Sequence, residues 1–126
     1  MREILWKHHI SFKNAFSGLF WALRTQPNFR VHLFLSLLAC LAGWYFSLSP
    51  IEWTIVVFTI VLGLTAEMIN TTLESMTDLI TTEWKQQAKI AKDVAAGMML
   101  VVAIGAVVVA ILIFGPHLEF KLFPRS

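Results

Sequence analysis

The stretch that decides the fold is residues 53–78, which read WTIVVFTIVLGLTAEMINTTLESMTD. No Gly, Pro or turn cluster separates the apolar segment, residues 53–66, from the polar run that starts at Glu67. One continuous helix is therefore predicted to pass through both. Residues three, four or seven positions apart share a helix face. The polar side chains of the run thus form one line, named here the polar stripe: Glu67, Asn70, Glu74 and Asp78.

The carboxylates of the polar stripe lie close together, so their mutual repulsion has to be offset. Carboxylates on one helical line repel each other unless a cation lies among them or one of them stays protonated. The arrangement suits a divalent metal ion, which binds hard oxygen ligands. The plain alternative is a solvated helix face just beyond a membrane. Glu67 weakens that alternative, because it lies within one helical turn of the apolar segment that is expected to cross the membrane. Ionisable side chains at that depth are costly and usually functional.

Two blocks of sequence resemble the signatures of a known family. The first is the pattern E-x-I-N-T-x-L-E-x-x-x-D from Glu67, and the second is AKIAKDVAAG at residues 88–97. Both are similar to the signatures of the small bacterial membrane lipid kinases, the diacylglycerol kinase and undecaprenol kinase family, with the family's spacing between them. A third, weaker block spans Asn28 to His32. The resemblance covers essentially the whole chain.

The composition is that of a membrane protein. Hydrophobic residues make up 57% of the 126 residues, charged residues make up only 14%, and the mean hydropathy is +0.70. A soluble domain of this size is far less apolar. The length allows one domain, residues 1–126.

The predicted fold is an all-α integral membrane protein with one surface helix and three transmembrane helices. Residues 1–27 mix basic and large apolar side chains at helical spacing, as in an amphipathic helix that lies in the membrane surface. The membrane helices are predicted over residues 29–49, 51–80 and 88–115.

Local signals set the predicted helix ends. Pro27 disfavours helical geometry at Gln26 and should end the surface helix. Ser49 is the predicted N-cap of the second membrane helix, with Glu52 in its first turn. Gly115 and the proline after it are predicted to end the third.

Basic residues predict the orientation in the membrane. The turn between the first two membrane helices carries none, whereas the flanking segments carry Arg2, Lys7, Lys13, Arg24, Arg30, Lys85, Lys89 and Lys92. By the positive-inside rule, the N-terminus and the connection between the second and third membrane helices are cytoplasmic. We therefore expect a multi-pass protein of the bacterial cytoplasmic membrane. Its polar stripe should face the cytoplasm, the compartment that holds ATP and magnesium.

The stripe offers the parts that phosphoryl transfer needs, without a Gly-rich phosphate loop. Glu74 is the natural metal ligand. Glu67 is the natural base for an alcohol at the membrane surface, and Asn70, one turn from each, can orient both.

The second block, residues 88–97, contains basic side chains that could bind phosphate. Lys89 and Lys92 are candidate phosphate partners. Asp93 either pairs with Lys92 or helps to hold the nucleotide. The plain alternative for both lysines is a positive-inside flank of the third membrane helix.

The family resemblance implies more specific roles. Glu67 would be the proton acceptor and Glu74 a Mg²⁺ ligand, in a homotrimer whose sites are shared between subunits. ATP would donate the phosphoryl group to the primary hydroxyl of a lipid in the bilayer, and no nucleic acid is expected as a partner. Nucleotide contacts are implied at Lys7, Asn14, Glu83, Trp84, Lys85, Lys92 and Asp93.

One position departs from the family. A glutamate that joins the metal site usually stands three residues before Phe29, and here that position is Gln26. An amide oxygen can bind Mg²⁺ but brings no charge. Gln26 therefore remains a candidate metal ligand. His32 or water could compensate for the missing glutamate.

Three classes of function compete: a lipid kinase, a non-catalytic membrane subunit and an ion or proton conductor. An ATP- and magnesium-dependent kinase that converts undecaprenol to undecaprenyl phosphate is favoured, because the second and third blocks look more like that branch. A diacylglycerol kinase that makes phosphatidic acid is the alternative, since nothing in the residues separates the two alcohols physically. A non-catalytic membrane subunit would have Gln26 as the mark of a decayed metal site. An ion or proton conductor is disfavoured, because its acids are confined to one end of one helix.

Overall fold

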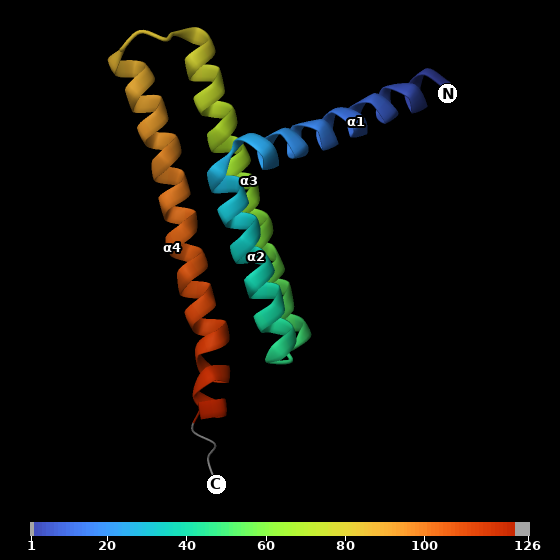
Figure 1. The fold of residues 1–126 in the computed structure, drawn as a ribbon, viewed down its shortest axis with the longest axis vertical. Helices are drawn as coiled ribbons and strands as arrows, with labels where there is room; N and C mark the ends of the chain where they lie inside the picture. The colour runs from blue at the N-terminus through green and yellow to red at the C-terminus, as the bar shows by residue number, and fades with distance from the viewer. Residues whose placement is uncertain (1, 123–126) are drawn as a thin grey trace.

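The computed structural model describes the backbone of residues 2–122 and the side chains of residues 11–121. Within that range the regular structure is entirely α-helical, which confirms the predicted all-α class. The helices are α1 (Arg2–Thr25), α2 (Pro27–Tyr45), α3 (Pro50–Ile80) and α4 (Gln86–Leu122). In Figure 1, α1 projects sideways from three long rods, and α3 runs antiparallel to both α2 and α4. The central rod is α3, because it packs against both of its neighbours.

The start of α3 follows the predicted cap. The Glu52 backbone N–H donates to Ser49 Oγ at 3.3 Å, and the Ser49 backbone N–H donates to Glu52 Oε2 at 2.7 Å. This reciprocal pair is a capping box, which satisfies two backbone donors that the helix cannot pair internally. Pro50 occupies the first turn, where its missing N–H costs nothing. The helix then continues unbroken to Ile80, so the polar stripe and its apolar lead-in share one helix, as predicted.

Two predicted boundaries are wrong near the turn before α3 and the break before α2. The first membrane helix was expected to reach residue 49, but α2 ends at Tyr45. Ser47 adopts a left-handed backbone, with φ of 55°, which an α-helix cannot include. The surface helix ends at Thr25 rather than at residue 27, because Gln26 is extended before Pro27, which itself begins α2.

The end of α4 was also predicted too early. The helix passes through Gly115 and Pro116 and continues to Leu122. Pro116 removes one backbone hydrogen bond, but neighbouring helices hold the extra turns in place. His117 Nε2 lies 2.9 Å from Glu52 Oε1 on α3, and Lys121 Nζ lies 3.7 Å from the ring centroid of Tyr45 on α2. These contacts are named here the distal clasp, because they lie at the end of the bundle away from the polar stripe.

The α2–α3 hairpin is closely packed at Gly43. A Cβ atom at this position would lie 2.9 Å from Trp53 Cη2 and 3.1 Å from Leu48 Cδ1. A side chain there would force the two helices apart. The small buried core sits at this same end, around Leu48, Val56 and Ile113.

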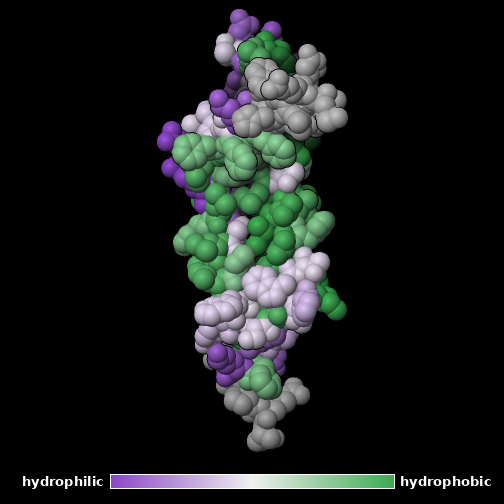
Figure 2. Space-filling model, turned by 90° about the vertical axis from the view of Figure 1, so that its right-hand side faces the viewer, coloured by the Kyte–Doolittle hydropathy of each residue, from purple (hydrophilic) through white to green (hydrophobic). Residues whose placement is uncertain are grey.

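The surface is that of a membrane protein. Two helices, α3 and α4, are long and apolar enough to cross a bilayer. Figure 2 shows a hydrophobic belt around the middle of the rods with hydrophilic side chains towards both ends. Large apolar side chains such as Phe58 and Ile111 are exposed on this belt. The shorter α2 does not reach the same hydropathy, since its first turns carry Asn28, Arg30 and His32.

Candidate active site

The polar stripe runs from a buried end to an exposed end. Glu67 is only 2% exposed and Asn70 only 6%, whereas Glu74 and Asp78 lie on the surface. Ala66 is buried beside Glu67, so this turn of α3 lies against its neighbours. Glu67 and Glu74 are seven residues apart on one unbroken helix, so they share a face of α3. The structure therefore brings the two glutamates to one side of α3, as the spacing predicted.

Asn70 is hydrogen-bonded to the next member of the stripe, Glu74. Its Nδ2 donates to Glu74 Oε1 at 3.0 Å, which fixes the orientation of the amide. The opposite atom, Asn70 Oδ1, is buried and has no hydrogen-bond partner among the described side chains. A buried oxygen without a donor carries a desolvation penalty of about 1–3 kcal/mol. The position therefore calls for a donor or a cation from outside the described side chains.

The oxygen atoms at this point fit a magnesium ion that arrives with phosphate. Glu74 supplies a carboxylate and Asn70 Oδ1 an unused carbonyl oxygen. Mg²⁺ is usually held by one or two carboxylates together with water and substrate phosphates. Residues 11–121 assemble no cluster of three acidic, histidine or cysteine ligands. The donor set thus suits a metal shared with a ligand, rather than one enclosed by the protein.

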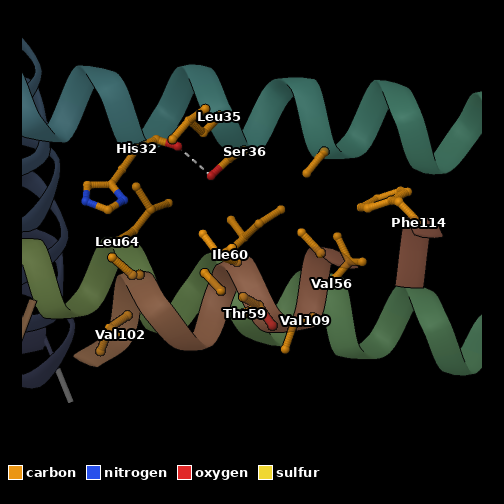
Figure 3. A pocket seen from close by; sticks show the side chains of 16 residues that line it. His32, Leu35, Ser36, Val56, Thr59, Ile60, Leu64, Val102, Val109 and Phe114 are labelled. Atoms are coloured by element: carbon orange, nitrogen blue, oxygen red, sulfur yellow. Dashed lines mark hydrogen bonds between the residues drawn. The ribbon is translucent and has the colours of Figure 1, made fainter. Parts of the chain in front are cut away.

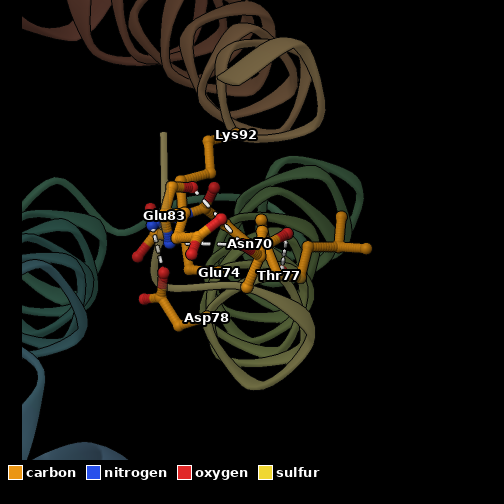
Figure 4. A network of polar contacts seen from close by, with 8 residues as sticks. Asn70, Glu74, Thr77, Asp78, Glu83 and Lys92 are labelled. Carbon is orange, nitrogen blue, oxygen red and sulfur yellow. Dashed lines mark hydrogen bonds and ion pairs between the residues drawn. The ribbon is translucent and has the colours of Figure 1, made fainter. Parts of the chain in front are cut away.

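A lysine from α4 reaches the exposed end of the stripe. Lys92 Nζ lies 2.5 Å from Asp78 Oδ1 on α3, and Figure 4 shows this contact beside the Asn70–Glu74 bond. Asp93 instead accepts from Lys89 Nζ, also at 2.5 Å. Of the two alternatives for Asp93, the pair with Lys92 is therefore not formed. Lys89 and Asp93 are four residues apart and share a helix face, whereas Lys92 points across to α3.

The connection between α3 and α4 lies at the same end. The Glu83 backbone N–H donates to Thr81 Oγ1 at 3.2 Å, which shapes the turn after α3. Trp84 is 79% exposed. Lys85 lines a small pocket of about 240 Å³ together with Thr77 and Ala91. Figure 4 draws Glu83 beside Glu74 and Asp78, and Lys85 shares its pocket with Thr77, the neighbour of Asp78 in the sequence.

Three other candidate residues belong to α1 or to its junction with α2. Asn14 is exposed on α1, which projects from the bundle. Lys7 also belongs to α1, in the part whose side chains lie outside the described residues. Gln26 Nε2 donates to Thr25 Oγ1 at 3.3 Å, at the junction of α1 and α2. Among the described side chains no hydrogen bond or ion pair joins Asn14 or Gln26 to the stripe.

A groove that we did not predict runs below the buried end of the stripe. It has a volume of about 330 Å³ and lies between α2 and α4, with α3 as its floor (Figure 3). His32 and Gly63 stand at the end nearest Glu67, and Phe114 stands at the other. Its walls are mostly apolar, with several small residues among them. The signal for it was the row of small residues at helical spacing on α4, Ala103, Ala106 and Ala110.

The comparisons with known proteins agree with this architecture. Residues 13–114 match the family model of prokaryotic diacylglycerol kinase. The chain is 40% identical over 101 residues to a diacylglycerol kinase of Synechocystis sp., an alignment that covers 79% of this chain and 58% of that longer protein. It is 37% identical over 108 residues to the undecaprenol kinase of Bacillus subtilis, which covers 86% of this chain and 88% of the relative.

A more distant relative extends the same pattern. A diacylglycerol kinase of Helicobacter pylori is 29% identical over 97 residues, covering 71% of this chain and 76% of the relative. The family model alone spans most of the chain, including the whole polar stripe and the second lysine-containing block. The chain therefore belongs to the prokaryotic diacylglycerol kinase family, a family of membrane lipid kinases.

Proposed function

We propose that this protein is an ATP- and magnesium-dependent kinase that phosphorylates the hydroxyl of a membrane lipid alcohol, with undecaprenol as the favoured substrate. The observation that carries the proposal is the change in side-chain exposure along the polar stripe. A buried glutamate, Glu67, stands at its membrane end, and a lysine from another helix, Lys92, stands at its exposed end. A lipid hydroxyl and a nucleotide phosphate would approach such a stripe from opposite ends.

The chemistry assigned to the residues is direct transfer. The Glu67 carboxylate accepts the proton of the lipid hydroxyl, whose oxygen then forms a bond to the γ-phosphorus of ATP. The bond from that phosphorus to the β-phosphate bridging oxygen breaks, and ADP leaves. Asn70 holds the geometry, because its amide is fixed by the 3.0 Å bond to Glu74. Positioning of this kind supplies much of the rate in phosphoryl transfer.

Glu74 would hold the magnesium ion, with the unpaired Asn70 Oδ1 beside it. A bound magnesium ion would neutralise charge on the polyphosphate. Gln26 is proposed as a further, neutral oxygen ligand. The nucleotide contacts are assigned to Lys7, Asn14, Glu83, Trp84, Lys85, Lys92 and Asp93.

The proposed assembly is a homotrimer of one-domain chains, residues 1–126. The argument is geometric. Helix α1 projects away from the other three helices, and its candidate residue Asn14 is exposed near the middle of α1. A site that includes α1 residues is completed more simply by a neighbouring subunit than by the same chain. The open groove between α2 and α4 likewise leaves the site unenclosed in one chain.

In the membrane, α2 is proposed as a third spanning helix beside α3 and α4. It pairs antiparallel with α3 through a tight turn, and it exposes Phe34, Leu37 and Leu41. The distribution of basic residues supports an orientation with the N-terminus and the α3–α4 connection in the cytoplasm, and the protein is proposed to lie in the cytoplasmic membrane of a bacterial cell. The polar stripe then opens towards cytoplasmic ATP.

The experiment that tests this function is a lipid phosphorylation assay with both alcohols side by side. Purified protein in mixed micelles is given γ-labelled ATP, magnesium and either undecaprenol or diacylglycerol. We expect label in undecaprenyl phosphate, at a higher kcat/KM than in phosphatidic acid. Faster labelling of diacylglycerol would reverse the substrate assignment, and no labelling of either would exclude the kinase proposal.

The groove below Glu67 is proposed to hold a hydrocarbon chain of the lipid. Ala106→Phe should fill it and lower kcat/KM for the long-chain alcohol by roughly 5- to 150-fold, the equivalent of the ~1–3 kcal/mol that overpacking costs. A short-chain alcohol that ends above Ala106 should be unaffected. Parallel measurements with both alcohols provide the check.

The matched control for the groove lies one position away on the same helix. A Cβ at Gly105 would have no neighbour within 4 Å, so Gly105→Phe adds the same ring outside the groove. We expect this variant to treat both alcohols as the unmodified protein does. An equal loss in Gly105→Phe and Ala106→Phe would show that the groove has no part in lipid binding.

A further inference from the structure

Asp78 is the one member of the polar stripe to which the proposed chemistry gives no part. It lies one turn beyond Glu74 on α3, at the exposed end. Its Oδ1 lies 2.5 Å from Lys92 Nζ, and the pair joins α3 to α4 (Figure 4). Lys92 is the same side chain that the proposed function assigns to a nucleotide phosphate. In this structure its ammonium group is already satisfied by a carboxylate.

We propose that Asp78 is a positioning residue that takes the place of a phosphate: it holds the Lys92 ammonium at the stripe until a nucleotide arrives, and then releases it. The inference rests on the proposed function. The ligand class is a nucleoside polyphosphate, and the exchange replaces one anionic partner of Lys92 with another. No covalent bond is made or broken in this step.

The exposure of the pair makes the exchange easy. The side chains of Lys92 and Asp78 are 41% and 59% exposed, so water and salt screen their attraction. Polyphosphate oxygens carry more negative charge than one carboxylate and form strong charge-assisted hydrogen bonds with a cation. The flexible stem of a lysine allows the ammonium group to change partners without movement of α4.

The exchange also has a consequence for the acidic side chains. When Lys92 leaves, Asp78 loses its counter-charge and stands one turn from Glu74. Two carboxylates at this separation favour binding of a cation. Removal of the lysine by phosphate therefore prepares the exposed end of the stripe for the magnesium ion that accompanies the nucleotide.

The other ion pair at this end of the bundle does not have this geometry. Lys89 and Asp93 lie on one helix, four residues apart, so their contact holds no two elements together. Only the Lys92–Asp78 pair, among the described side chains at this end, places an α4 cation against the α3 stripe.

Equilibrium binding of ATP to the full chain in nanodiscs tests the proposal. In the absence of magnesium, Asp78→Asn should bind ATP about two- to fivefold more tightly, since it removes a weak competitor for Lys92. Magnesium should then increase the affinity of Asp78→Asn less than it increases that of the unmodified protein. Asp78→Glu, which keeps the carboxylate, should restore both behaviours.

A double-mutant cycle separates this role from a merely structural one. In a Lys92→Met background, Asp78→Asn should no longer change the affinity for ATP, because no ammonium group is left to release. Asp78→Ser is a second way to remove the carboxylate and should match Asp78→Asn, even if one of them folds poorly. Glu119→Gln, at the distal end of α4, makes the same change in net charge and should leave ATP binding unaltered.

The outcomes distinguish the inference from the proposed function. Weaker or unchanged magnesium-free binding in Asp78→Asn, together with a loss of binding in Lys92→Met, would overturn the exchange while the kinase assignment stands. Unmodified protein that binds no ATP would instead overturn the proposed function, and the exchange with it.

Discussion

Replacing Glu67 with glutamine is expected to lower kcat for lipid phosphorylation by about 10²–10⁴, the range that a positioned general base contributes. The amide has nearly the same shape as the carboxylate but cannot accept the hydroxyl proton. Glu67 is 2% exposed on α3, so bulk water cannot readily take over its role. Affinity for ATP should stay within about twofold, because the nucleotide contacts lie at the other end of the stripe. Single-turnover rates and ATP binding, measured on the same preparation, separate the two effects.

The control for Glu67→Gln is the same substitution at an exposed site. Glu119→Gln lies near the end of α4 and should retain full kcat. Unchanged turnover in Glu67→Gln would mean that this glutamate does not act on the reacting hydroxyl. Loss of turnover together with a large loss of ATP affinity would instead indicate a general disturbance of the stripe.

Glu74→Ala should produce a different kind of defect. We expect the magnesium concentration that gives half-maximal rate to rise by more than about 100-fold, because loss even of a group that only supports a metal ligand costs about 10–100-fold in affinity. The substitution also removes the acceptor for Asn70 Nδ2, which lies 3.0 Å from Glu74 Oε1. A titration of the rate with magnesium measures the change.

The two variants can be told apart by their response to magnesium. High magnesium should partly restore Glu74→Ala, whereas it should not restore Glu67→Gln, whose missing function is proton acceptance. Glu74→Asp keeps the charge on a shorter side chain and should fall between Glu74→Ala and the unmodified protein. A magnesium dependence that Glu74→Ala leaves unchanged would exclude Glu74 from the metal site.

Much of the site was predictable because a single helix carries it. The spacing of the stripe places Glu67, Asn70 and Glu74 on one face wherever the helix lies, and the structure joins Asn70 to Glu74 as that spacing implies. The Ser49–Glu52 capping box was predictable for the same reason. Its two residues are three apart, so no tertiary information was needed.

Features that depend on neighbouring helices were not predictable. Local rules end a helix at Gly115 and Pro116, yet α4 continues, since Glu52 from α3 holds the turn that follows. The partner of Lys92 depends on how α4 faces α3, which a one-dimensional pattern does not specify. The groove has the same origin, because its walls come from three separate helices.

The distal clasp has a consequence for how a bulky lipid could reach Glu67. Polar contacts join the helices at their two extremities, through Lys92 and Asp78 on one side and His117 and Glu52 on the other. Between these anchors the groove is lined mainly by apolar side chains, and no hydrogen bond or ion pair among the described side chains joins α2 to α4 across it. Both anchors join α4 to α3, so a lipid chain could enter sideways through the open groove between α2 and α4 while both anchors stay intact.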